Sequence, residues 1–182
     1  MNFKILDLFC GAGGLSYGMH QNPHFQTAVA LDVNEKLAIT LKNNMPEVDV
    51  IVGDIKDQSV KDKVIDLSIK HGVNMIIGGP PCQGYSMKGK KLGLEDPRNF
   101  LFIEYLNFVE KLQPEVFVIE NVKTLLSTSK GWFKEQILSA IEQLDLNKPT
   151  DTILPSIFKP KTGKKNKTSV TMSNNENHKL IV

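Results

Sequence analysis

Short apolar segments alternate with helix-forming segments along most of the chain, and this alternation restricts the possible fold more than any other feature. The apolar segments, each predicted to be a strand, cover residues 3–9, 27–31, 48–52, 73–77 and 115–119. The predicted helices cover residues 13–20, 34–44, 59–71, 99–112 and 132–144. Asn34 is placed to cap the second helix. Strands that are apolar throughout are typical of a parallel sheet covered by helices on both faces, so we expect an α/β fold with a mostly parallel sheet.

Polar or reactive residues directly follow each predicted strand. They are the glycine-rich turn at residues 9–14, Asp32, Asp54, the Pro81–Cys82 pair and the Glu120–Asn121 pair. In a parallel sheet the carboxyl ends of the strands lie along one edge, and ligands bind there in folds of this kind. We therefore expect a single cleft that collects all of these sites.

The composition is that of an ordinary globular chain. Of 182 residues, 41% are hydrophobic and 23% are charged, and the net charge of +2 does not by itself indicate a nucleic-acid partner. Cys10 and Cys82 form no Cys-x-x-Cys pair, so neither a disulfide scaffold nor a metal site is expected. The chain has no signal-peptide pattern and no apolar run of the ~18 residues that a membrane span needs. We expect a cytoplasmic protein with no membrane segment.

Three features of the first half have both a binding and a structural interpretation. The glycine-rich turn at residues 11–14 either lets a ligand approach the backbone or is only a tight turn. Asp32 can accept hydrogen bonds from the two hydroxyls of a ribose, or be an exposed loop aspartate. Asp54 can accept from an exocyclic adenine amine, or cap the following helix. The turn is not the dinucleotide GxGxxG motif, so none of these features decides the function alone.

The segment GGPPCQGYS, residues 78–86, presents a thiol at the end of a strand. Its proline and glycine neighbours suit Cys82 as an exposed nucleophile about as well as a structural cysteine. Cys10, in contrast, follows an apolar strand and is expected to pack inside. Glu120, in VFVIENV, emerges from a buried strand, where apolar walls would raise its pKa and suit an acid catalyst. The alternative for Glu120 and Asn121 is a helix-capping pair.

Taken together, these segments resemble the DNA (cytosine-5-)-methyltransferase family. DLFCGAGGLSYG, GDI, GGPPCQGYS, DPRNFLF and ENV occur in the family's order over residues 3–144, and Glu120 follows Cys82 by 38 residues. The resemblance implies a Rossmann-like S-adenosylmethionine-dependent methyltransferase fold, here incomplete. It also implies methyl transfer from S-adenosylmethionine to carbon 5 of cytosine in double-stranded DNA, as in restriction-modification systems.

The resemblance further implies a role for each site residue. Cys82 attacks carbon 6 of cytosine, Glu120 contacts ring nitrogen 3 and the exocyclic amine, and Asn121 completes the catalytic set. The residues implied to form the S-adenosylmethionine site are Phe9, Gly11, Gly13, Asp32, Asp54, Ile55, Pro81 and Leu101. The residues implied to contact DNA are Ser86, Lys90 and Arg98.

The chain departs from the family pattern after residue 144. The family continues with a Gln-x-Arg-x-Arg element, a target-recognition domain and a closing segment, whereas no QxRxR occurs here and Arg98 is the only arginine. Residues 1–145 are predicted to be a partial catalytic domain and residues 146–182 a basic, polar, flexible tail. Because arginines commonly read guanine and contact phosphates, a second polypeptide is expected to supply target recognition.

Three alternatives remain open at this point. The first is an S-adenosylmethionine-binding protein that is inactive without a second chain. The second is an RNA methyltransferase of the same family, although its Cys-Phe-Thr segment is not present. The third is an α/β domain without a ligand.

Overall fold

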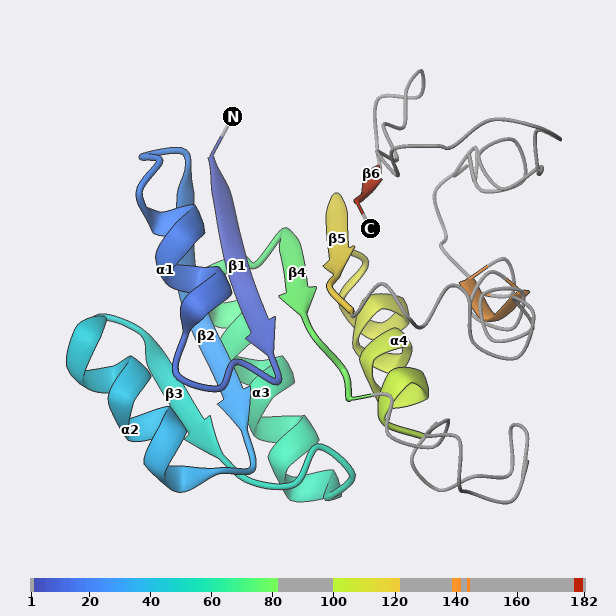
Figure 1. The fold of residues 1–182 in the computed structure, drawn as a ribbon. Coiled ribbons are helices and arrows are strands. Elements are labelled where there is room, and N and C mark those ends of the chain that lie inside the picture. The colour runs from blue at the N-terminus through green and yellow to red at the C-terminus, as the bar shows by residue number, and fades with distance from the viewer. Residues whose placement is uncertain (1, 82–99, 122–138, 142–143, 145–178, 182) are drawn as a thin grey trace, which may run out of the picture.

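The computed structural model describes residues 2–81, 100–121, 139–141, 144 and 179–181. The strands in these residues form one six-stranded parallel sheet in the order β3-β2-β1-β4-β5-β6 (Figure 1). The strands are β1 Phe3–Leu8, β2 Phe25–Asp32, β3 Asp49–Val52, β4 Met75–Gly78, β5 Val116–Ile119 and β6 Lys179–Ile181. The helices are α1 Gly14–His20, α2 Glu35–Asn44, α3 Gln58–His71 and α4 Phe100–Leu112. The predicted α/β class with a parallel sheet is confirmed.

The order of the strands creates a crevice beside β1. The chain first builds outward from β1 through β2 to β3, and then returns to the other side of β1 to form β4 and β5. The connections that leave the carboxyl ends of β1 and β4 therefore run toward opposite faces of the sheet. A reversal of this kind is where open α/β sheets bind their ligands.

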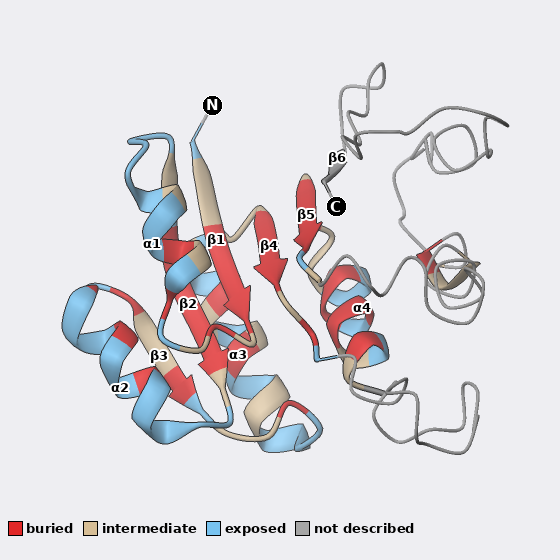
Figure 2. Cartoon of the chain, in the orientation of Figure 1, coloured by how far each residue is buried: buried red, intermediate tan, exposed pale blue. Residues whose placement is uncertain are grey.

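The two faces of the sheet carry separate apolar cores. On one face, Leu6 and Leu8 of β1 pack with Val64 of α3 and with the apolar side of α4. On the other face, Ile5 of β1 belongs to a cluster that packs against Leu15 of α1, and α2 packs there beside β2 and β3. Figure 2 shows the result, with buried strands between helices that expose their outer sides. The prediction of helices on both faces is thus confirmed.

Most predicted elements lie close to their expected positions. Asn34 caps α2, because its side-chain oxygen accepts a hydrogen bond of 3.2 Å from the backbone N–H of Leu37. Of the helix predicted at residues 132–144, the structure describes only residues 139–141, which are helical, and Leu144, which is not. No helix in the described part of the chain is long and apolar enough to cross a membrane.

The strand β6 was not predicted. It lies in the tail of residues 146–182 and pairs with β5 in parallel, from Val116 opposite Lys179 to Val118 opposite Ile181. It therefore pairs with the edge of β5 that β4 leaves open. A strand of three residues beside a polar segment has no alternation long enough to be recognised. The remainder of the tail lies outside the described residues, and the domain boundary at residue 145 stays a prediction.

Gly78, at the end of β4, is a point of close backbone contact. A Cβ atom there would lie 2.3 Å from the backbone oxygen of Leu8 and 3.2 Å from the ring of Tyr105. The oxygen belongs to a neighbouring strand and cannot move away without breaking the pairing of β1 with β4. The absence of a side chain at position 78 therefore lets these two strand ends come together.

Gly78→Ala is expected to lower the free energy of unfolding by about 3 kcal/mol or more, because the added methyl group meets backbone on one side and a buried ring on the other. Gly18→Ala is the matched control. Gly18 lies exposed within α1, with nothing within 4 Å of its added Cβ, and alanine there should raise stability by about 0.5–1 kcal/mol. Urea unfolding followed by circular dichroism measures both. Equal free energies of unfolding for Gly78→Ala and Gly18→Ala would contradict the close backbone contact at Gly78.

Candidate functional site

The turn that follows β1 has an unusual backbone. Phe9, Gly11 and Gly13 all have positive φ, at 60°, 53° and 86° respectively, which is rare for a residue with a side chain such as Phe9. At Gly13 the space for a side chain is also missing, since a Cβ there would lie 2.8 Å from Cγ of Leu41. The two glycines thus shape the turn, and helix α1 begins directly after it.

Asp32, the last residue of β2, fastens this turn to the sheet. One oxygen of its half-buried carboxylate accepts a 2.7 Å hydrogen bond from the backbone N–H of Gly11, and the other accepts a 2.7 Å bond from the N–H of Asn34. The interpretation of Asp32 as an exposed loop aspartate is therefore wrong. Because each carboxylate oxygen has two lone pairs, Asp32 can still accept hydrogen bonds from a ligand.

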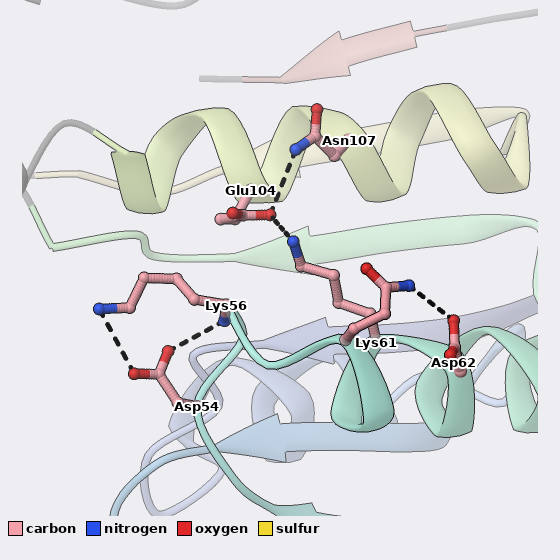
Figure 3. A network of polar contacts seen from close by, with 7 residues as sticks. Asp54, Lys56, Lys61, Asp62, Glu104 and Asn107 are labelled. Atoms are coloured by element: carbon pink, nitrogen blue, oxygen red, sulfur yellow. Dashed lines mark hydrogen bonds and ion pairs between the residues drawn. The ribbon is translucent and has the colours of Figure 1, made fainter.

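Asp54 follows β3 and does not cap the next helix. Its carboxylate accepts a 2.9 Å hydrogen bond from the backbone N–H of Lys56 and lies 3.4 Å from the ammonium group of the same residue (Figure 3). The N-cap position of α3 belongs to Asp57 instead. The helix-capping interpretation of Asp54 is wrong, and its carboxylate remains available at the strand end.

A pocket of about 160 Å³ connects the ends of these strands. Its lining is mostly apolar, with two carboxylates and one ammonium group. The lining residues are Phe9, Leu31, Asp32, Val33, Gly53, Asp54, Ile55, Lys56, Pro81 and Leu101. Six of the eight residues predicted to form the cofactor site lie on this pocket: Phe9, Asp32, Asp54, Ile55, Pro81 and Leu101. The predicted convergence of the strand ends on one cleft is borne out for these residues.

Gly11 and Gly13, also predicted to form the cofactor site, do not line this pocket but set the course of the turn beside it, and their role in binding stays a prediction. Four lining residues were missed: Leu31, Val33, Gly53 and Lys56. Each is a direct neighbour of Asp32, Asp54 or Ile55, and that adjacency was the only signal in the sequence that could have found them.

An ion pair joins α3 to α4. The ammonium group of Lys61 on α3 lies 2.6 Å from the carboxylate of Glu104 on α4, and these side chains are only 20% and 15% exposed. Asn107 donates a further hydrogen bond to Glu104, at 3.2 Å (Figure 3). The pair thus links the helix that carries Leu101 to the helix that follows Ile55, and both residues line the pocket.

Two ionisable side chains lie beneath the turn. Cys10 is 7% exposed, and burial raises the pKa of its thiol, so it packs inside as predicted and is not a thiolate. Asp7 is 1% exposed and accepts a hydrogen bond from the hydroxyl of Ser16. Burial raises the pKa of Asp7 to about 7, and the charge of Asp32 adds to this effect while the bond from Ser16 opposes it. Asp7 lies within the apolar segment of residues 3–9, and no signal in the sequence indicated that it is a buried ionisable residue.

Two hydrogen bonds join the chain at the ends of β4 and β5, in addition to the backbone pairing of these strands. The backbone N–H of Glu120 donates to the oxygen of Gly78 at 2.9 Å, and the side-chain amide of Asn121 donates to the oxygen of Pro80 at 2.9 Å. The carboxylate of Glu120 reaches over Gly79, whose added Cβ would lie 2.9 Å from Oε2. Glu120 is exposed, whereas the prediction had its carboxyl between apolar walls.

Several predicted site residues lie outside the described part of the chain. They are Cys82, Ser86, Lys90 and Arg98. Pro81, which directly precedes Cys82, is described and lines the pocket. Among the described residues, no group of three or more His, Cys, Asp or Glu side chains could hold a metal ion.

Comparison with known proteins gives the family. The sequence pattern of C-5 cytosine-specific DNA methylases matches residues 3–156. The chain belongs to this family. Its methylase segment is 41% identical over 146 residues to the type II methyltransferase M.AquIA of Picosynechococcus sp., and 39% identical over 142 residues to the type II methyltransferase M.AgeI of Thalassovita gelatinovora. These matches cover 79% and 78% of this chain.

Solved structures agree with the fold. A putative DNA modification methyltransferase encoded within an E. coli prophage superimposes with a TM-score of 0.62 at 26% identity, over 78% of this chain and 38% of that protein. The Dnmt2 methyltransferase of S. pombe has the same fold, with a TM-score of 0.55 at 21% identity, over 76% of this chain and 40% of that protein. The matched part of the chain spans 58% of M.AquIA and 33% of M.AgeI.

Asp7→Asn is expected to flatten the dependence of stability on pH. Between pH 4 and 7 the carboxyl of Asp7 is ionised in the unfolded chain, where its pKa is 3.8, but protonated in the folded one, where it is about 7. The folded state then binds more protons, so stability falls as pH rises through this interval and levels off above it. Urea unfolding of both proteins across this range measures the difference. Parallel curves would contradict the shifted pKa.

Proposed function

We propose that this chain carries the methyl-donor site and the nucleophile of a DNA (cytosine-5-)-methyltransferase. In this proposal it transfers a methyl group from S-adenosylmethionine to carbon 5 of cytosine through a covalent Cys82 adduct, as part of a restriction-modification system. The observation that carries the proposal is the pocket in which Asp32, Asp54 and Pro81 meet at the ends of three strands. Family membership supports the reaction type.

The donors and acceptors of the pocket fit S-adenosylmethionine. Asp32 would accept from the ribose hydroxyls and Asp54 from the adenine amine, while Phe9, Ile55 and Leu101 supply apolar contacts for the adenine ring. S-adenosylmethionine supplies an activated methyl group when bound. These residues hold and orient it, and they need no change of protonation to do so.

The glycine turn favours a nucleoside ligand without phosphates. A turn that binds phosphate needs free backbone N–H groups, and carboxylates near it repel the anion. Here the N–H of Gly11 already donates to Asp32, and Asp32 and Asp54 both border the pocket. S-adenosylmethionine carries no phosphate, whereas a dinucleotide carries two. The site thus suits the former.

The proposed chemistry uses the adjoining strand ends. A cytosine within a duplex must first be extruded, at a cost on the order of a few kcal/mol. The thiolate of Cys82 forms a bond to carbon 6, which makes carbon 5 nucleophilic. Glu120 stabilises the developing charge through ring nitrogen 3 and the exocyclic amine. Carbon 5 takes the methyl group, leaving S-adenosylhomocysteine, and a base such as water then removes the proton of carbon 5 while the carbon–sulfur bond breaks to release the Cys82 thiolate. The hydrogen bond from Asn121 to Pro80 holds the strand end that leads to the nucleophile.

Double-stranded DNA is the proposed substrate, with Ser86, Lys90 and Arg98 as its contacts. We propose that sequence recognition comes from a further segment or a second polypeptide. Two observations support this: the chain spans 58% and 33% of its relatives M.AquIA and M.AgeI, and Arg98 is its only arginine. The alternative is an S-adenosylmethionine-binding protein that is inactive alone. Its predicted behaviour differs from that of the enzyme only in that no covalent adduct with cytosine forms.

Asp54→Ala is expected to weaken S-adenosylmethionine binding by about tenfold or more, because it removes an acceptor for a hydrogen bond that involves a charged group. Asp62→Ala is the matched control, since Asp62 is an exposed aspartate on α3 that does not line the pocket. Isothermal calorimetry with S-adenosylmethionine measures both dissociation constants. If Asp54→Ala binds as tightly as Asp62→Ala, the assignment of this carboxylate is wrong.

Covalent trapping tests the reaction. In DNA in which every cytosine is replaced by 5-fluorocytosine, every target sequence present carries the analogue, and such DNA should form a denaturation-resistant adduct with the chain in the presence of S-adenosylmethionine. Cys82→Ser is expected to abolish the adduct, since the serine hydroxyl is a far weaker nucleophile. Cys10→Ala, which removes the buried thiol, should retain it.

The adduct should be sought with the chain alone and with candidate recognition chains added. Trapping only after addition supports a separate recognition partner. Binding of S-adenosylmethionine without an adduct under any condition supports the inactive alternative. An adduct that survives in Cys82→Ser would overturn the assignment of the nucleophile.

A further inference from the structure

The hydroxyl of Tyr105 bridges two strands of the sheet. Tyr105 lies on α4 with its side chain fully buried, and its hydroxyl lies 2.9 Å from the backbone oxygen of Val118 on β5 and 3.1 Å from that of Ile76 on β4. The single phenolic proton is therefore shared between two neighbouring strands. It is a side-chain link between β4 and β5 from below the sheet, in addition to their backbone ladder.

Each of the two bridged residues lies two positions before the end of its strand or a proposed catalytic residue. Ile76 precedes Gly78, the last residue of β4, after which the chain continues through Pro80 and Pro81 to Cys82. Val118 precedes Glu120 at the end of β5. The link thus lies directly behind the two strand ends whose relative position the proposed reaction depends on.

The strand ends in front of Tyr105 are arranged tightly. Its ring carbon Cε2 would lie 3.2 Å from a Cβ at Gly78, and Gly78 accepts the 2.9 Å hydrogen bond from the N–H of Glu120. A sideways shift of either strand would therefore disturb both the hydroxyl link and this bond. The hydroxyl of Tyr105 and the bond from Glu120 to Gly78 thus both depend on the distance between β4 and β5.

Packing alone does not require a hydroxyl here. Phe102, Phe108 and Phe117 fill the same apolar core without a polar group. Burying a hydroxyl among them is unfavourable unless it is hydrogen-bonded, and both acceptors are main-chain atoms at fixed positions. Burial also raises the pKa of Tyr105 well above its usual value, so the group stays protonated and remains a donor.

We propose that Tyr105 is a positioning residue for methyl transfer, whose hydroxyl holds the ends of β4 and β5 at the separation that sets Glu120 against the segment leading to Cys82. It touches no substrate and acts only through the two strands. The inference rests on the proposed function for its catalytic consequence, but its structural content can be measured without any reaction.

The test compares Tyr105→Phe with Phe108→Leu in the full chain. Phe108 is a buried residue of the same helix, 2% exposed and without a polar group, so its substitution lowers stability without touching the strand link. Two amides are followed by hydrogen exchange: that of Glu120, which reports the β4–β5 end, and that of Gly11, which reports the distant bond to Asp32. Covalent trapping by 5-fluorocytosine DNA and calorimetry with S-adenosylmethionine are measured alongside.

Tyr105→Phe should speed exchange of the Glu120 amide relative to that of Gly11 by about tenfold, the effect of losing one buried hydrogen bond. It should slow trapping by about tenfold while S-adenosylmethionine binds within about twofold of wild type. Phe108→Leu should change both amides in parallel and slow trapping far less. Parallel changes of the two amides in Tyr105→Phe, or equal loss of trapping in the two variants, would overturn the proposal.

Failure of the proposed function has a different signature. If the wild-type chain forms no adduct with any recognition chain, the methyltransferase assignment fails, and the hydrogen-exchange comparison alone decides whether Tyr105 sets the strand spacing. Faster exchange in Tyr105→Phe at the Glu120 amide but not at the Gly11 amide supports the link between the strands. An equal increase at both amides refutes it.

Discussion

The parallel alignment of the strands is the constraint on which the rest of this structure depends. Because β1 pairs in parallel with both β2 and β4, every connection leaves the sheet at the same edge. Groups at those exits can then meet although they are distant in sequence, as the backbone N–H of Gly11 and the carboxylate of Asp32 do across 21 residues. The alignment in turn needs Gly78, since a side chain there would separate β4 from the oxygen of Leu8.

The charges at this edge are balanced locally. Asp32 accepts hydrogen bonds from two backbone N–H groups and Asp54 pairs with Lys56, so both carboxylates have partners within the chain. Asp7 lies underneath with a raised pKa and a bond from Ser16, and the nearby charge of Asp32 favours its protonated form. Under the proposed function, ribose hydroxyls that donate to Asp32 would weaken the effect of its charge on the pKa of Asp7.

The sequence was informative where the signal was periodic or local. The alternation of apolar and helix-forming segments predicted the parallel sheet. The position of Asn34 directly before α2 predicted that it caps this helix, and the apolar strand before Cys10 predicted that Cys10 is buried. Tyr105 could not be found in this way, because its place on an apolar helix matches that of a core phenylalanine and only tertiary structure supplies its two acceptors. Cys82 lies outside the described residues, so its role stays a prediction supported by family membership.

The proposed chemistry and the recognition of DNA place different demands on a fold. Reactive and cofactor-binding groups need only the short turns at the ends of a rigid sheet, where a few side chains are held by neighbouring backbone. Phosphate contacts can be made by lysines anywhere on the surface, but they carry no sequence information. Base contacts need bidentate groups projected into a groove, most often arginines. Arg98 is the only arginine of the chain, so under the proposed function most of these base contacts are expected from a further segment or a second polypeptide.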